Sequence, residues 1–204
     1  MNLTLKNKAE LTWVVIKHLA WAILDILLIP LWLVAPPFVA IFTRAMPDED
    51  RVYVWGGIFG TWDNPPQGDP KHLRDGLFPD ATTGLKGYAM RVLWMWRNPA
   101  YGFAYAFKVD KTPHSVVEIS GNPDITDKYA IAGSYLAVVK EKGKVVAYEY
   151  YTIKPYGAHS EVGKCFRMRW GWKIITDKWD EFGFAQPVDT ITPYKGYGES
   201  LKRK

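Results

Sequence analysis

Two runs of basic and aromatic residues have the types and spacing of a binding surface. The runs are Arg91, Trp94 and Arg97, then Arg167, Arg169 and Lys173. Guanidinium groups bind phosphate through paired hydrogen bonds. Beside a membrane anchor, such groups attract anionic lipid at about 1 kcal/mol per charge. We therefore expect these six residues to form a surface that binds anions, lipid or a protein partner. For the first run there is an alternative, in which Arg97 and Asn98 bind loop carbonyls around an Asn-Pro turn.

No catalytic constellation accompanies these runs. A serine nucleophile is expected on a Gly-x-Ser-x-Gly elbow, which Ser134 and Ser160 both lack. The histidines in expected loops have no partner at ligand spacing: His72, His114 and His159. Cys165 is the single cysteine, which excludes an intrachain disulfide framework and a multi-cysteine zinc site. The sequence predicts a protein that is not an enzyme, with no catalytic residue, cofactor or metal site.

Glycine, proline and aspartate dominate residues 56–87, which predicts a long irregular segment. Its oxygen-bearing side chains are Asp63, Asn64, Asp69, Asp75 and Asp80. Their spacing does not match an EF-hand loop, which needs ligands at alternate positions and a closing glutamate. We expect these residues to form turns.

Composition narrows the class of protein. The chain has 204 residues and a net charge of +5, and 15% of its residues are aromatic, including 10 Trp and 12 Tyr. That length allows one domain, or one domain with an anchor. A nucleic-acid-binding protein would show a denser basic stripe, so nucleic acid is not an expected partner. Aromatic residues gather in cores, at binding surfaces and at membrane interfaces.

The stretch from Leu19 to Thr43 is apolar and carries one formal charge, Asp25. As a straight helix at about 1.5 Å per residue, it would exceed the ~30 Å core of a bilayer. Pro30 and the Pro36-Pro37 pair are expected to break or kink it.

A polar stripe runs along one side of the helix that this N-terminal region would form. Its members are Lys6, Asn7, Glu10, Lys17, His18 and Asp25, and Val14 and Trp21 share the same side. Intramembrane charge is costly and usually faces a partner, a cavity or headgroups. Two interpretations follow for Lys17, His18 and Asp25. In the first, which we favour, the segment is an interfacial helix or a shallow hairpin that lies in the membrane interface with its polar stripe toward water. In the second, the helix spans the membrane and the stripe meets another subunit.

The rest of the chain predicts an α+β fold. Apolar residues at three- and four-residue spacing predict a helix over Leu85–Arg97, and alternation over residues 101–107 predicts a strand or an extended arm. Strands are expected at 115–120, 134–140, 145–153, 164–175 and 184–191, with a hairpin turn at 141–144. In the fourth strand, the face with Arg167, Arg169 and Lys173 is expected to be basic and wet. We infer an N-terminal apolar helical segment (1–46) and a Trp- and Tyr-rich domain (47–204), in which about five or six mainly antiparallel strands pack against the Leu85–Trp96 helix.

The run around the predicted helix resembles a known group of proteins. Its matching residues are Arg91, Trp94, Arg97, Asn98, Pro99, Tyr101, Gly102 and Phe103, followed later by Arg169, Gly171, Trp172 and Lys173. With the apolar N-terminus, these residues are similar to those of small uncharacterised proteins of tailed bacteriophages. The resemblance implies a phage origin and a membrane seat. The group has no assigned activity, so the resemblance transfers no site residue.

Two functions follow as hypotheses. The first is a non-enzymatic, membrane-associated phage accessory protein that acts at the host membrane (the inner membrane of a bacterium). The second is a structural component of the virion, with the apolar segment buried against other subunits. The expected partners are accordingly a lipid bilayer or other protein subunits, and a homo-oligomer is compatible with both hypotheses.

Overall fold

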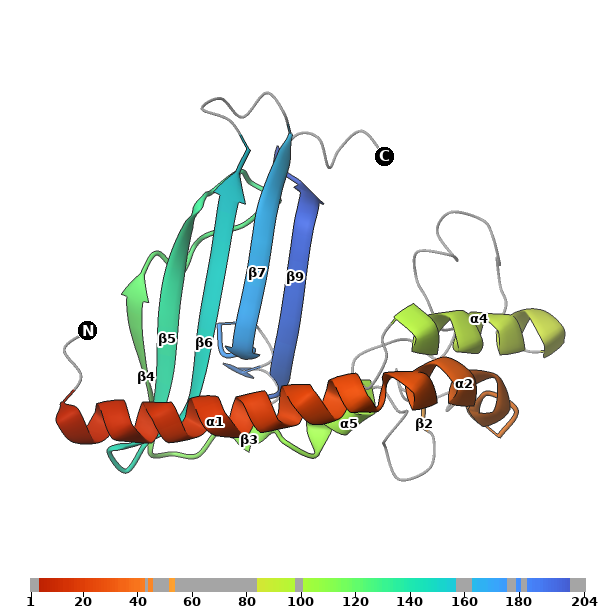
Figure 1. The fold of residues 1–204 in the computed structure, drawn as a ribbon, viewed down its shortest axis with the longest axis horizontal. Helices are drawn as coiled ribbons and strands as arrows, with labels where there is room; N and C mark the ends of the chain where they lie inside the picture. The colour runs from red at the N-terminus through yellow and green to blue at the C-terminus, as the bar shows by residue number, and fades with distance from the viewer. Residues whose placement is uncertain are drawn as a thin grey trace. The chain divides into compact units, whose positions relative to one another are not determined.

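The computed structural model (Figure 1) describes residues 4–42, 44–45, 52–53, 84–97, 101–156, 163–175, 179–180 and 183–198. Several predictions fall outside these ranges: most of the irregular segment 56–87 with its acidic residues, the Asn98-Pro99 turn, and the residues His72, His159 and Ser160.

The predicted α+β class is confirmed: N-terminal helices precede a mainly antiparallel sheet. The helices are α1 (Leu5–Leu27), α2 (Ile29–Val39), α4 (Gly84–Arg97) and α5 (Tyr101–Tyr105). The short strands are β1 (Arg44–Ala45), β2 (Val52–Tyr53), β3 (Val109–Asp110) and β8 (Phe184–Ala185). The main strands are β4 (Ser115–Gly121), β5 (Gly133–Glu141), β6 (Lys144–Pro155), β7 (Lys164–Trp172) and β9 (Pro187–Gly196).

The chain forms two compact units. One comprises Met1–Ala22 and Lys108–Lys204, and the other comprises Ile23–Phe107. This grouping differs from a division at residues 46 and 47, because the first part of α1 belongs with the sheet. We refer to the two units as the sheet unit and the helical unit.

In the sheet unit, five strands lie in the order β4-β5-β6-β7-β9, and every neighbouring pair is antiparallel. The predicted hairpin between β5 and β6 is confirmed. Lys142 and Gly143 occupy its turn with φ values of 48° and 79°. Two consecutive positive φ angles match the right-handed twist of the flanking strands, and glycine adopts such an angle without steric cost.

The two faces of this sheet have different coverings. Tyr148, Trp170 and Trp172 share one face by register, and α1 packs there. On the opposite face, the segment between β4 and β5 places Ile125 in the core and Asp127 beside Arg167. The core therefore extends on both sides of the sheet, which explains why the central strands are rich in apolar residues on both faces.

Within the sheet unit, the helix packed on the sheet is α1; the Leu85–Trp96 helix, which was predicted to pack there, belongs to the helical unit. That predicted helix does form, as α4. However, its buried Val92 and Met95 belong to a cluster in the helical unit with Val39 and Ala40. The apolar stripe of α4 correctly indicated a buried face, but α2 supplies the surface that buries it.

The expectation of a strand or an extended arm over residues 101–107 is wrong, because Tyr101–Tyr105 form the helix α5. Helical spacing brings Phe103 and Phe107 together edge to face, with ring centroids 5.3 Å apart. Phe103 also packs against Trp32, at 6.0 Å. The alternation of aromatic and small residues is thus satisfied by helical packing within the helical unit.

Candidate functional site

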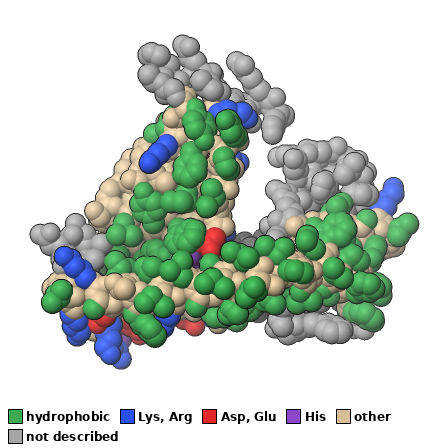
Figure 2. Space-filling view, in the orientation of Figure 1, with side chains coloured by type: hydrophobic (Ala, Val, Ile, Leu, Met, Phe, Trp, Pro, Cys, Tyr) green, Lys and Arg blue, Asp and Glu red, His purple; other side chains and the backbone are tan. Residues whose placement is uncertain are grey.

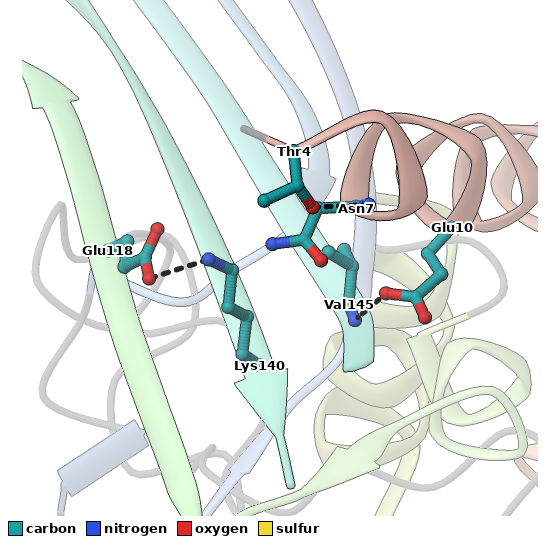
Figure 3. A network of polar contacts seen from close by, with 6 residues as sticks. All are labelled: Thr4, Asn7, Glu10, Glu118, Lys140 and Val145. Carbon is teal, nitrogen blue, oxygen red and sulfur yellow. Dashed lines mark hydrogen bonds and ion pairs between the residues drawn. The ribbon is translucent and has the colours of Figure 1, made fainter. Parts of the chain in front are cut away.

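Helix α1 is the element that joins the sheet to an exposed apolar surface. Thr4 caps its start, since the Thr4 Oγ1 accepts a hydrogen bond from the Asn7 N–H at 3.2 Å (Figure 3). One turn later, the Glu10 carboxylate accepts a hydrogen bond from the Val145 N–H at 3.0 Å. Val145 follows the β5–β6 turn, so this bond fixes the beginning of α1 at one end of the sheet.

His18 is the central buried polar group between α1 and the sheet, with no exposed surface. Its Nδ1 lies 3.2 Å from the Tyr148 hydroxyl, and its Nε2 lies 3.2 Å from Asp189 Oδ1. The Tyr148 hydroxyl can donate to Nδ1, and the Asp189 carboxylate lies on the Nε2 side of the ring. Three indole rings lie 5.3–5.5 Å from the imidazole: Trp21, Trp170 and Trp172.

The buried environment of His18 also changes the pKa of Tyr148. Burial raises the pKa of Tyr148 from 10.0 to about 12, with a smaller contribution from the nearby Asp189 carboxylate. The hydroxyl is protonated at neutral pH, like that of any tyrosine, so it can donate to His18; the raised pKa extends this range to higher pH. This arrangement holds α1 on the sheet; because His18 is fully buried, we assign it a structural role.

The predicted polar stripe is only partly as expected. Both interpretations directed it toward water or another subunit, yet Glu10 and His18 face the sheet of their own chain. Lys17 is exposed at the margin, with its Nζ 5.7 Å from the Trp13 ring centroid. Asp25 lies in the helical unit and is half-buried. Helical periodicity identifies the residues that share a face, but the element covering that face comes from distant parts of the chain.

The outer face of α1 is apolar and exposed. Within the sheet unit, Trp13 is 58% exposed and Ile16 is 49% exposed. Further exposed apolar residues of this helix are Leu5, Leu19, Ile23, Leu24, Ile26 and Leu27. Figure 2 shows hydrophobic side chains along its whole length. At 100° per residue, Lys6 and Lys17 lie on one flank of this face and Lys8 lies on the other.

Helix α2 adds exposed apolar side chains to the helical unit. They are Ile29, Leu31, Leu33, Val34 and Phe38, followed by Ile41 and Phe42. Among the described residues, no single helix is long and apolar enough to cross a membrane. The bent pair Leu5–Leu27 and Ile29–Val39 passes that test jointly on length and composition, with an angle of 58° at the break.

The prolines shape α2 in a way that involves α4. Pro30 stands in the first turn of α2, where a missing N–H costs nothing, and the predicted break there is confirmed. A break or a kink was also predicted at Pro36 and Pro37, but the helix continues through this pair to Val39 without a break. Pro37 has no N–H to give to the Leu33 carbonyl, which instead accepts the Trp96 indole N–H at 2.9 Å.

A second side chain of α4 satisfies the end of α2. The Tyr88 hydroxyl donates to the Pro37 carbonyl at 2.9 Å. Tyr88 and Trp96 therefore supply donors to two carbonyls near the proline pair, where main-chain bonding is interrupted or ends. This pairing explains how a helix containing two internal prolines persists, and it ties α2 to α4.

The first basic run lies on α4, within the helical unit. Burial lowers the pKa of Arg91, and its side chain is half-buried. Trp94 and Arg97 occupy helical positions on the same element, and their side chains lie outside what the structure describes. The predicted surface formed by this run stays a prediction.

The second basic run is half-buried and paired with acids, so the expectation of a wet basic face is wrong. Arg167 Nη1 lies 3.3 Å from Asp127 Oδ2, and Lys195 Nζ lies 3.7 Å from the same oxygen. Asp127 comes from the segment before β5, a region in which the sequence analysis placed no partner. Arg167 and Lys195 therefore share one carboxylate within the sheet unit.

Arg169 lies beside a buried carboxylate, Glu149, whose charge also acts on Lys173. Arg169 Nε lies 3.0 Å from Glu149 Oε1, and its guanidinium stacks 4.3 Å from the Tyr151 ring centroid. Glu149 is fully buried, and its Oε2 accepts the backbone N–H groups of Ile174 and Ile175. Burial, reinforced by Arg169, lowers the pKa of Lys173.

Sequence reasoning missed Glu149 as the centre of this cluster. The signal was a lone charge between apolar and aromatic residues in the run Val-Ala-Tyr-Glu-Tyr-Tyr. A carboxylate at a central position of a buried strand requires partners. Arg167, Arg169 and Lys173 lie on one strand and its continuation, as predicted, and the acids near them belong to the same sheet unit.

The described residues offer little else with reactive character. Cys165 is fully buried, and burial raises the pKa of its thiol, with a further contribution from Asp127. Within the described ranges, no three His, Cys, Asp or Glu side chains gather in a way that could hold a metal ion.

Comparison with known families gives one match. Residues 10–199 match DUF7338, a family of unknown function. The chain belongs to this family. The match includes most of α1, all of α2 and the whole sheet, so the elements described above lie within the family's common region. Neither the curated proteins nor the solved structures contain a significant match to the chain.

Proposed function

We propose that this member of DUF7338 is a non-enzymatic, membrane-associated protein that lies on one side of a bilayer. The main observation in support is that α1 has one face buried against the sheet and one exposed apolar face. Val14 and His18 are buried against the sheet, whereas Trp13 and Ile16 on the outer side are about half exposed. An amphipathic helix of this kind lies in the interface with its apolar side among the acyl chains.

The attachment of α1 to the sheet argues for an interfacial position over a spanning one. A helix that crossed the membrane through its first four turns would carry Tyr148 and the attached sheet into the hydrocarbon region. That sheet presents polar groups and ends in two edge strands, β4 and β9, and a bilayer does not accommodate the open edges of a sheet. Lying flat, α1 inserts only its outer face, and Lys6, Lys8 and Lys17 on its flanks reach the headgroups.

The helical unit supports the same proposal with its own surface. Leu33, Val34 and Phe38 of α2 are about 60% exposed, and the contacts with Tyr88 and Trp96 use carbonyl oxygens of α2. The exposed side chains thus remain available for lipid, as in a shallow hairpin.

The phage assignment rests on the sequence resemblance alone, and the proposed setting is the membrane of an infected bacterium. Mass spectrometry of purified phage particles tests the alternative, a virion component. A structural protein would appear there in fixed copy number, whereas an accessory protein of the host membrane would be absent.

Vesicle flotation of the Ile16→Glu variant tests whether the outer face of α1 binds lipid. Burying an isoleucine side chain contributes roughly 1.5–3 kcal/mol, so its exposed half accounts for about 1 kcal/mol of binding, and the introduced carboxylate adds a desolvation cost. We expect binding to weaken by about tenfold or more. The matched control is Tyr129→Glu, an exposed aromatic residue in the segment that covers the opposite face of the sheet; it should bind like the wild type. Equal binding by all three proteins would overturn the proposal.

A further inference from the structure

We propose that strand β4 is a docking edge for a second copy of this chain, which pairs with it antiparallel to continue the sheet. In the described part of the chain, β4 has one neighbour, β5, and stands at the end of the strand order. Alternate residues of such a strand direct unpaired N–H and C=O groups outward. These groups are a template for strand addition.

The edge lacks the features that normally prevent pairing. Natural proteins protect an edge with proline, lysine, a bulge or an inward charge. β4 contains no proline, and its register with β5 is regular. Its one charge, Glu118, lies 2.6 Å from Lys140 Nζ on the neighbouring strand (Figure 3). An approaching identical strand therefore meets a compensated carboxylate, with Val116 56% exposed and Ile119 41% exposed.

The other edge of the same sheet shows these protections. β9 carries Pro187 and Pro193, neither of which can donate to a further strand. Lys195 lies on the same strand, and the register with β7 shifts between Cys165 and Arg167. The contrast between β9 and β4 indicates that pairing is prevented at one edge and permitted at the other.

Self-pairing fits the side chains of β4. A two-fold axis perpendicular to the sheet, passing midway between the two β4 strands, can place Val117 opposite its copy. Val116 then lies opposite Glu118 of the other copy, so the two carboxylates are not directly opposed. β-branched residues suit cross-strand pairs on a pleated surface.

The same two-fold axis favours a second copy of this chain as the strand that pairs with β4. This argument rests on the proposed membrane association. Rotation about an axis perpendicular to the sheet keeps equivalent faces on one side. Since α1 packs on the face that carries Tyr148 and Trp170, both copies of α1 lie on that side. Their apolar outer faces then point in one direction, and both can insert into a single bilayer.

Strand pairing over seven residues makes a small interface, at the low end of stable protein contacts. We therefore expect a concentration-dependent dimer that is strengthened when both copies share a membrane, because confinement raises the effective concentration.

The test is sedimentation equilibrium of the full chain in detergent. We expect the wild type to associate toward twice its 23.3 kDa mass. Ile119→Lys places a charge on the β4 edge and should weaken association by about tenfold or more. The matched control is Ile191→Lys, an exposed isoleucine on the protected strand β9, which should associate like the wild type. Circular dichroism of both variants confirms that each is folded.

A wild-type chain that stays monomeric at every concentration, or an equal loss of association in both variants, overturns the proposal. Flotation of the same proteins separates this result from the membrane seat. A wild-type chain that binds vesicles but stays monomeric refutes the β4 interface alone, whereas a wild-type chain that dimerises but does not bind vesicles refutes the membrane association alone.

Discussion

Replacing Glu149 by leucine should strongly destabilise the sheet unit. The Glu149 Oε2 accepts N–H groups from Ile174 at 2.8 Å and Ile175 at 2.7 Å. Leucine has a similar volume but accepts no hydrogen bond, so two buried or half-buried donors lose their acceptor. Each such donor costs roughly 1–3 kcal/mol. Arg169 also loses its carboxylate partner, but its side chain is 22% exposed, so water compensates much of that loss.

These contributions give a loss of about 4 kcal/mol in the free energy of unfolding, a large part of the roughly 5–15 kcal/mol typical of a domain. The assay is urea unfolding of the full chain in detergent, followed by circular dichroism of the sheet. Glu149→Gln keeps one acceptor oxygen and should lose about half as much. The control is Glu118→Gln, which breaks a more exposed ion pair with Lys140 and should cost less than about 1 kcal/mol. If Glu149→Leu unfolds like this control, the buried carboxylate does not organise the chain after β7.

Two further predictions concern Tyr148 and Trp96. Burial raises the pKa of Tyr148 from 10.0 to about 12, so the folded state keeps a proton that the unfolded state loses. The associated stability is complete below pH 10 and is lost as the pH rises toward about 12, at about 1.4 kcal/mol per pH unit. Urea midpoints measured across this range should fall less steeply for Tyr148→Phe; identical slopes would contradict the assignment. Trp96→Phe removes the donor to the Leu33 carbonyl and should destabilise the helical unit by about 1 kcal/mol. Hydrogen exchange of α2 amides measures this effect, and unchanged exchange would show that water replaces the indole.

Local patterns were sufficient for most of the elements. Apolar residues at helical spacing predicted α4 within one residue of its observed start, and alternation predicted the strands β4 to β7. The turn at Lys142 and Gly143 followed from a glycine between two apolar runs. These features depend on neighbours within a few positions, so the sequence carries them directly. The apolar N-terminal segment and its polar stripe were equally visible.

Which segments pack against each face of α1 and of the sheet could be learned only from the tertiary structure. The stripe on α1 indicated that Glu10 and His18 share a side, but the partner of His18 is Tyr148, 130 positions away. The alternation in β7 likewise placed Arg167 and Arg169 together, while the acids that pair with them come from the segment before β5 and from β6. The sequence by itself determined periodicity, and hence which side chains share a face. Only the folded chain decided what lies against that face, because burial and charge pairing depend on contacts between residues far apart in the sequence.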